Sequence, residues 1–234
     1  MSSSIPLATA LSKLPNFDPR TVAVAGIDAH LPPVAGDALR PEALRARFAA
    51  RRPWHPEIII ERPWTAQATA QASVLVPIVS RGQMTVILTE RTTHLSTHSG
   101  QVAFPGGKRD DSDTDAAHTA LREAHEEIGL ERRFVDVIGE LPIYTTGSQF
   151  VITPVIALVH PDHLLKLNAY EVADAFEVPL EFLMNPAHHR RHVLEVDGSQ
   201  REWFSMPYMD GTTERFIWGA TAAMLRNLYR FLVA

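Results

Sequence analysis

The chain has 234 residues, of which 45% are hydrophobic and 21% charged, and it carries a formal net charge of −5 with no cysteine. This composition predicts an ordinary globular protein with an ample core, and it argues against a general nucleic-acid binder, which is usually basic. The lack of cysteine excludes disulfides, thiolate catalysis and zinc–thiolate centres.

The N-terminal sequence does not resemble a secretion signal, because no basic stretch precedes an apolar one. No apolar run approaches the roughly 18 residues that a membrane-spanning helix needs. We therefore expect a cytoplasmic protein without membrane contact.

Residues 1–65 are predicted to form an N-terminal, proline-rich extension, and residues 66–234 the main domain. Nine of the 17 prolines lie before residue 64. One helix is expected in the extension, around residues 41–51, because Pro41 suits the first turn of a helix.

From Gln71 onward, short apolar segments alternate with turn residues. Two β-rich segments at 72–80 and 84–91 flank Arg81-Gly82-Gln83, which predicts a hairpin. Further strands are expected at residues 100–104, 134–141, 150–159, 191–196 and 202–206. Helices are expected from about residue 113 to 128, near 180–184 and at 219–233, the last with apolar residues at helical spacing. This order predicts an α+β or α/β sandwich rather than a doubly wound sheet.

Three glutamates crowd the helix end before Gly129, in the run ALREAHEEIGL. Glu123, Glu126 and Glu127 are spaced i, i+3 and i+4, so they share one helix face. Gly129 is expected to end the helix, where acids are disfavoured, and the Glu123–Glu127 pair adds a repulsion of roughly 0.2–0.5 kcal/mol. Such a cluster indicates a hard divalent cation, Mg²⁺ or Mn²⁺. The competing interpretation is a solvated helix face on which Arg122 pairs with Glu126.

A glycine turn and an acidic loop precede this helix. Gly106-Gly107 allows a tight turn and the close approach of a ligand. Asp113 or Ser112 is expected to cap the helix N-terminus.

Together these segments resemble the Nudix box, whose pattern is G-x5-E-x7-R-E-U-x-E-E-x-G-U with U aliphatic. The second half of the pattern matches at Arg122, Glu123, Glu126, Glu127, Gly129 and Leu130. The first half fits once one residue is inserted, which puts Gly107 at the glycine and Asp113 at the first glutamate. A helix cap explains Asp113 equally well.

The segment upstream is similar to the L-T-x-R-S-x3-R-x3-G-x3-F-P-G-G signature of coenzyme A pyrophosphatases within the Nudix family. Here it runs from Leu88 through Arg91 and Gly100 to Phe104-Pro105-Gly106-Gly107. Ser96 stands where the signature has its second arginine. The resemblance covers roughly residues 71–230.

The resemblance implies a Nudix-type α/β/α sandwich with a mixed central sheet. It also implies Mg²⁺- or Mn²⁺-dependent hydrolysis of the diphosphate bond of coenzyme A or its thioesters, giving phosphopantetheine and adenosine 3′,5′-bisphosphate. Two alternatives stay open: hydrolysis of ADP-ribose or another nucleoside diphosphate derivative, which Ser96 favours, and a non-catalytic Nudix-like ligand sensor. The expected partner is a small-molecule nucleotide, with no nucleic acid and no membrane, and a homodimer also stays open.

By the same resemblance, Glu123 and Glu127 are the main metal ligands. Glu126 is a third ligand or the catalytic residue that orients the water. Arg122 belongs to the catalytic machinery as a brace for a glutamate.

The resemblance also implies a set of substrate-binding residues at the signature positions Arg91, Phe104, Gly106 and Gly107. Of these, Arg91 is the expected contact to a substrate phosphate. Glu171 and Glu177, from later segments, are alternatives to Glu126 as the general base.

Overall fold

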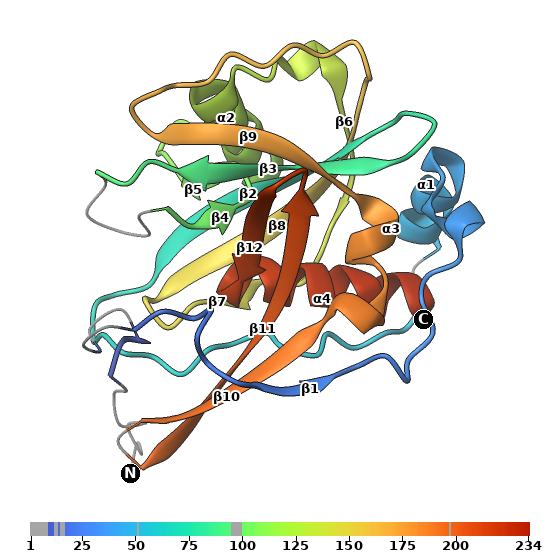
Figure 1. Ribbon diagram of the computed structural model, residues 1–234. Helices are drawn as coiled ribbons and strands as arrows, with labels where there is room; N and C mark the ends of the chain where they lie inside the picture. The colour runs from blue at the N-terminus through green and yellow to red at the C-terminus, as the bar shows by residue number, and fades with distance from the viewer. Residues whose placement is uncertain (1–8, 12–13, 15–16, 51, 95–99, 197) are drawn as a thin grey trace.

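The computed structural model describes residues 9–11, 14, 17–50, 52–94, 100–196 and 198–234. Its centre is an eight-stranded mixed sheet in the order β4-β3-β2-β8-β6, with β5, β7 and β9 paired beside β2, β8 and β3 (Figure 1). β2 and β8 run parallel along their whole length, whereas β3 pairs antiparallel with β2, β4 and β9. The strands are β2 (Ala70–Val79), β3 (Thr85–Arg91), β4 (Val102–Ala103), β5 (Gly106–Lys108), β6 (Val135–Glu140), β7 (Tyr144–Thr145), β8 (Phe150–Val159) and β9 (Val172–Pro179).

Alternating side chains of the central strands build two cores, one on each face of the sheet. On one face, Leu75, Val79 and Ile87 pack against helix α2 (Ala116–Ile128). The helix contributes a buried stripe at helical spacing that includes Ala120 and Ala124.

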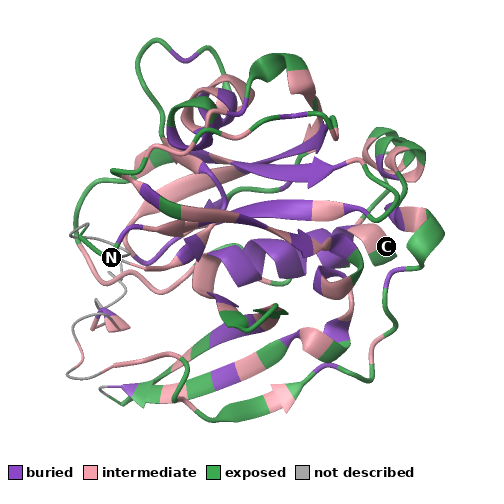
Figure 2. Ribbon diagram, turned by 45° about the horizontal axis from the view of Figure 1, so that its top comes forward, coloured by how far each residue is buried: buried purple, intermediate pink, exposed green. Residues whose placement is uncertain are grey.

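The opposite face carries the larger core. Val76, Ile78 and Leu88 pack there against helix α4 (Gly219–Val233), which Figure 2 shows as one of the most buried elements. A helix therefore covers each face of a mixed sheet, which confirms the predicted α/β/α sandwich. Among the described residues, no helix is long and apolar enough to cross a membrane.

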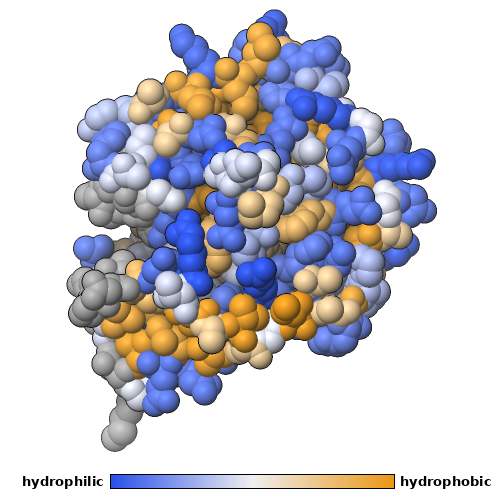
Figure 3. Space-filling view, in the orientation of Figure 1, coloured by the Kyte–Doolittle hydropathy of each residue, from blue (hydrophilic) through white to orange (hydrophobic). Residues whose placement is uncertain are grey.

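A second, four-stranded antiparallel sheet in the order β1-β10-β11-β12 lies beside the sandwich (Figure 1). Its strands are β1 (Val24–Ile27), β10 (Arg190–Val196), β11 (Ser199–Asp210) and β12 (Thr213–Trp218). The lower part of Figure 3 shows apolar residues gathered where Figure 1 places β1 and β10; Val24, Ile27 and Val193 are exposed there.

The strands and helices predicted for residues 72–234 are present, but five strands of the structure were missed: β1, β5, β7, β9 and β12. β5 and β7 have only three and two residues, too few for a sequence pattern. β1 is short and contains a glycine, β9 places acids between its apolar residues, and β12 ends at Trp218, directly before α4 begins at Gly219. The remaining elements are helices α1 (Pro41–Ala49) and α3 (Leu180–Leu183) and the 3-10 turns η2 (Gly36–Leu39), η3 (Arg132–Phe134) and η4 (Pro186–His188).

The segment before residue 66 is joined to the rest of the chain by a buried ion network. Arg226 of α4, 1% exposed, contacts Asp28 at 2.9 Å and Glu57 at 2.7 Å. Arg191 of β10 contacts the same two acids, at 2.8 and 2.6 Å. Burial lowers the pKa of the neighbouring His189 to about 4, so this imidazole is neutral and accepts from Arg226. Two arginines thus hold both acids of the N-terminal segment against α4 and β10.

We predict that Arg226→Met lowers the free energy of unfolding by about 3 kcal/mol, because it leaves the buried Asp28 carboxylate short of a partner. The matched control is Arg230→Met, on the same helix but exposed, which should change it by less than about 0.5 kcal/mol. Urea denaturation followed by circular dichroism measures both. Equal effects of the two substitutions would show that the network contributes nothing.

Candidate active site

Helix α2 begins and ends on side chains and backbone that suit its termini. Asp115 caps the start, where its carboxylate accepts from the His118 backbone N–H at 2.7 Å. Gly129 ends the helix with a left-handed φ of 67°, as predicted. The predicted cap at Asp113 or Ser112 is wrong, because the helix starts later and Asp113 is buried elsewhere.

The three glutamates at the end of α2 lie at different depths. The side chain of Glu127 is 4% exposed, that of Glu123 16% and that of Glu126 54%. Burial raises the pKa of Glu123 above its usual range, while the Arg122 guanidinium opposes that rise. The cluster is therefore graded, from a buried carboxylate to an open one.

Glu127 is the deepest of the three and contacts two segments from earlier in the chain. Its Oε2 accepts from the Gly106 backbone N–H at 3.0 Å, and its Oε1 lies 3.4 Å from a terminal nitrogen of Arg91. Burial raises its pKa to about 7; Gly106 and Arg91 lower it, and the charges of Glu123 and Glu171 raise it further. The contacts with Gly106 and Arg91 thus only partly replace the hydration that the Glu127 carboxylate loses on burial.

Arg122 lies at the centre of a hydrogen-bond network beside this cluster. One terminal nitrogen donates to Glu123 at 2.9 Å and to Glu126 at 3.1 Å, and the other donates to the Lys108 carbonyl at 3.0 Å. The guanidinium also makes a two-pronged contact with the buried carboxylate of Asp113, at 2.9 and 3.1 Å. Hydrogen bonding to Arg122 holds the pKa of Asp113 well below its usual range. Asp113 therefore anchors the arginine that holds two of the glutamates.

The glycine turn lets the cluster come close to the sheet. A Cβ at Gly107 would lie 2.4 Å from Oε2 of Glu123, and one at Gly106 would lie 2.4 Å from the Ser73 carbonyl oxygen. β5, which carries both glycines, is squeezed between β2 and α2. Any side chain at Gly107 would have to displace the Glu123 carboxylate.

Arg91 reaches the cluster from the last residue of β3. Odd-numbered residues of β3, such as Ile87, face α2, and Arg91 keeps that side. Its side chain is 25% exposed, and its Nε is buried with no hydrogen-bond partner among the described residues. A buried guanidinium donor without a partner is costly, which favours a ligand at this position.

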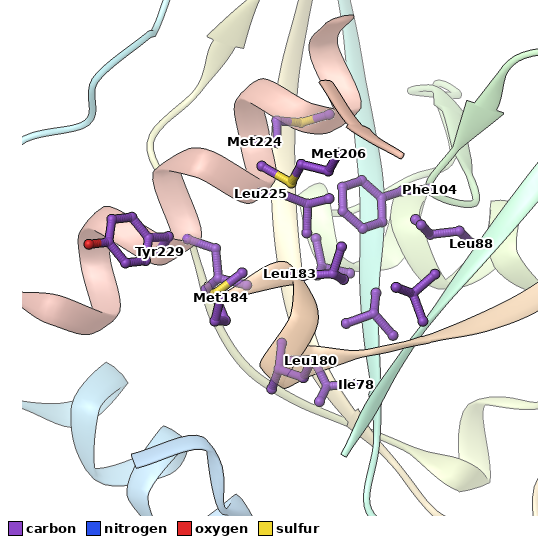
Figure 4. Packing of buried hydrophobic residues seen from close by; sticks show 14 of the residues in the cluster. Ile78, Leu88, Phe104, Leu180, Leu183, Met184, Met206, Met224, Leu225 and Tyr229 are labelled. Carbon is purple, nitrogen blue, oxygen red and sulfur yellow. The ribbon is translucent and has the colours of Figure 1, made fainter. Parts of the chain in front are cut away.

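Phe104, another predicted substrate-binding residue, lies in the core. It is 3% exposed, and Figure 4 shows its ring beside Leu88, Leu225 and Met206. It supports the glycine turn from within the protein and presents no side chain at the carboxylate cluster.

The two acids from later segments lie at different places. Glu177 accepts from Thr85 and pairs with Arg81, near the β2–β3 turn. Glu171 lies just before β9, and its charge raises the pKa of both Glu123 and Glu127. The turn from Asn168 to Glu171 is attached to α2, because the Asn168 N–H donates to the Glu127 carbonyl at 2.9 Å. No local sequence pattern predicts this contact.

The donor set at the end of α2 fits a divalent cation. Within the described part of the chain, no three metal-binding side chains are already gathered around one position, because Arg122 holds Glu123 and Glu126 while Gly106 and Arg91 hold Glu127. The carboxylates are nevertheless hard oxygen donors, as such a cation prefers. Burial raises the pKa values of Glu123 and Glu127, and a bound cation would lower them again. Glu123 and Glu127, with Glu126 beside them, are the residues that would hold it.

Comparison with known proteins shows to which family this chain belongs. The NUDIX domain model matches residues 69–206. A protein of Escherichia coli K12 named "Uncharacterized Nudix hydrolase NudL" is 40% identical over 159 residues, covering 68% of this chain and 80% of that protein. The protein of the same name from Yersinia pestis (strain Pestoides F) is 36% identical over 183 residues, covering 78% and 89%. Among solved structures, the chain is similar to a Caenorhabditis elegans Ap4A hydrolase in a binary complex. The match has 18% identity and a TM-score of 0.41, and it covers 51% of this chain and 86% of that one.

The fold and the glutamate helix are those of a Nudix hydrolase, and the matches place this chain in the NUDIX domain family. It is accordingly a hydrolase that acts on nucleoside diphosphate derivatives.

We predict that Glu127→Gln stabilises the metal-free protein, and more so at pH 8 than at pH 5. The folded-state pKa of Glu127 is raised from 4.5 to about 7. The folded state therefore binds a proton that the unfolded state has already lost, and stability falls as the pH rises from 4.5 to 7. The amide removes this loss, which amounts to roughly 3 kcal/mol at most. Denaturation in chelator at both pH values measures it; equal gains at pH 5 and pH 8 would contradict the raised pKa.

We predict that Gly107→Ala weakens Mn²⁺ binding by roughly 10- to 100-fold, because the new Cβ displaces the Glu123 carboxylate. Gly82→Ala, in an exposed turn with no atom within 4 Å of its Cβ, is the matched control and should bind Mn²⁺ as the wild type does. Titration calorimetry measures both affinities. Unchanged binding by Gly107→Ala would remove Glu123 from the ligand set.

Proposed function

We propose that the chain hydrolyses the diphosphate bond of coenzyme A or its thioesters, giving phosphopantetheine and adenosine 3′,5′-bisphosphate. One observation carries the proposal: the two separate segments of the coenzyme A pyrophosphatase signature meet on one carboxylate. Arg91 of the first segment contacts Oε1 of Glu127, and Gly106 of the second contacts Oε2. The signature is thus supported as a single site rather than two unrelated stretches.

In this proposal, Mg²⁺ or Mn²⁺ held by Glu123 and Glu127 would neutralise the diphosphate and lower the pKa of the attacking water. Arg91, whose Nε has no hydrogen-bond partner among the described residues, binds a non-bridging phosphate oxygen. Arg122 acts at one remove, because its hydrogen bonds orient the carboxylates of Glu123 and Glu126.

Two acids are suited to take the proton from the attacking water. Glu126 is the most exposed carboxylate of the cluster and is held by Arg122 at 3.1 Å. Glu171 is the later acid whose charge reaches Glu123 and Glu127, whereas Glu177 is engaged near the β2–β3 turn. We therefore propose Glu126 or Glu171 as the base, and not Glu177.

A related activity on ADP-ribose is the second candidate. Ser96 occupies the position of the second arginine of the signature, and it falls outside the described residues. If that arginine holds a phosphate of coenzyme A, its replacement shifts the preference toward other nucleoside diphosphate derivatives.

The test is hydrolysis of coenzyme A, ADP-ribose and NADH by the purified protein with Mg²⁺, with products resolved by chromatography. We expect coenzyme A to give phosphopantetheine and adenosine 3′,5′-bisphosphate. Glu127→Gln should lower kcat at least about 100-fold, because it removes a ligand of the cation that would activate the attacking water. The control Glu131→Gln changes an exposed acid just beyond the helix and should retain activity. Faster turnover of ADP-ribose would establish the second candidate, and equal activity of the wild type and Glu127→Gln would refute the assigned site.

A further inference from the structure

Arg215 of β12 gathers three carboxylates from three different strands. Its side chain is 11% exposed; it contacts Glu90 at 2.8 Å and Asp210 at 3.2 Å, and it also pairs with Asp174. Its guanidinium carbon lies 4.2 Å from the ring centroid of Phe176. In Figure 1 the β11–β12 hairpin reaches up to β3 and β9, where these partners lie. Arg215 thus ties the second sheet to the ends of β3 and β9 in the central sheet.

Two of these carboxylates would repel each other without the arginine. Glu90 on β3 and Asp174 on β9 lie directly opposite each other in an antiparallel pair. Like charges in that relation destabilise strand pairing. Arg215 lies between them and supplies the opposite charge, so the end of the β3–β9 ladder depends on it.

This ladder end carries residues of the candidate active site. Glu90 and Arg91 are neighbours on β3, so their side chains leave opposite faces of the sheet: Glu90 meets Arg215 on one side and Arg91 meets Glu127 on the other. Between them the register shifts, since Glu90 pairs with Asp174 but Arg91 pairs with Val172. Ala173 is therefore the extra residue of a bulge in β9, and such a bulge bends its strand and increases the local twist of the pair.

Glu171 depends on the same ladder end. It directly precedes Val172, the partner of Arg91, and its carbonyl accepts from the Thr92 N–H at 3.0 Å. A change in the bulge therefore moves Arg91 and Glu171 together.

We propose that Arg215 is a positioning residue for phosphate binding: by clamping Glu90 and Asp174 behind the sheet, it fixes the β3–β9 pairing that holds the end of β3, and with it Arg91, at the carboxylate cluster. The inference rests on the proposed phosphate contact of Arg91. It does not depend on which nucleoside diphosphate derivative is the substrate.

The test is a double-mutant cycle between Arg215→Met and Arg91→Ala, with two readouts. The first is the affinity for methylenediphosphonate, a diphosphate that is not hydrolysed, measured by calorimetry with Mg²⁺. The second is the KM for whichever diphosphate substrate the wild type turns over. When Arg91 is present, we expect Arg215→Met to lower the affinity for methylenediphosphonate and to raise KM, each by roughly 10- to 100-fold. In the Arg91→Ala background both changes should be less than about twofold, because the two substitutions remove the same contact.

A merely structural role gives a different pattern. Arg215→Met would then lower stability and weaken binding by equal factors whether or not Arg91 is present, and the proposal would fall. Unchanged diphosphate binding by Arg215→Met would also overturn it. If Arg215→Met does not fold, Arg215→Lys replaces it in the same cycle; it keeps the charge but not the planar fork, so it should lose part of the affinity, again only when Arg91 is present.

Failure of the inference and failure of the proposed function have separate signatures. A wild type that binds methylenediphosphonate but does not hydrolyse coenzyme A removes the proposed substrate and leaves the cycle measurable. A wild type that does not bind the diphosphate refutes the phosphate contact of Arg91, and the role of Arg215 falls with it.

Discussion

Glu127 carries a carboxylate that the fold removes almost completely from water, and the rest of the site is arranged around it. With 4% of the side chain exposed, the charge depends on the Gly106 N–H and the Arg91 guanidinium. Gly106 reaches Glu127 from β5, where a Cβ would clash with Ser73 and Val74 of β2, and Arg91 reaches it from the end of β3. The pKa of about 7 shows that these contacts do not fully replace water. In the proposed reaction, a divalent cation would supply the missing stabilisation.

The surrounding structure holds this buried charge from two directions. Within the box, Asp113 anchors Arg122, which orients Glu123 and Glu126. From behind the sheet, Arg215 neutralises the acids next to Arg91. Both arginines are themselves held by carboxylates, so each has one main orientation, as a positioning role requires.

The sequence predicted the elements whose pattern is local, and it missed contacts between distant segments. The strands around residues 72–91 and helix α2 follow from apolar periodicity and from Gly129, so they were predicted within a few residues. The role of Asp113 was ambiguous because a cap and an ion pair need the same residue type at nearly the same position. The approach of Glu171 to α2 and the clamp of Arg215 depend on strand pairing across more than 40 residues, which no local pattern encodes. β9 was missed because its two acids, Asp174 and Glu177, interrupt its apolar pattern; Asp174 serves the Arg215 clamp.

Proton release on metal binding tests most directly whether the buried carboxylate is the centre of the site. Below pH 7 the metal-free protein should hold a proton on Glu127, and a cation that binds there must displace it. Calorimetric titration with Mn²⁺ at pH 6, in two buffers of different ionisation enthalpy, counts that proton. The account predicts that the wild type releases up to about one proton more than Glu127→Gln does. Mn²⁺ binding with the same proton count in both proteins would contradict it.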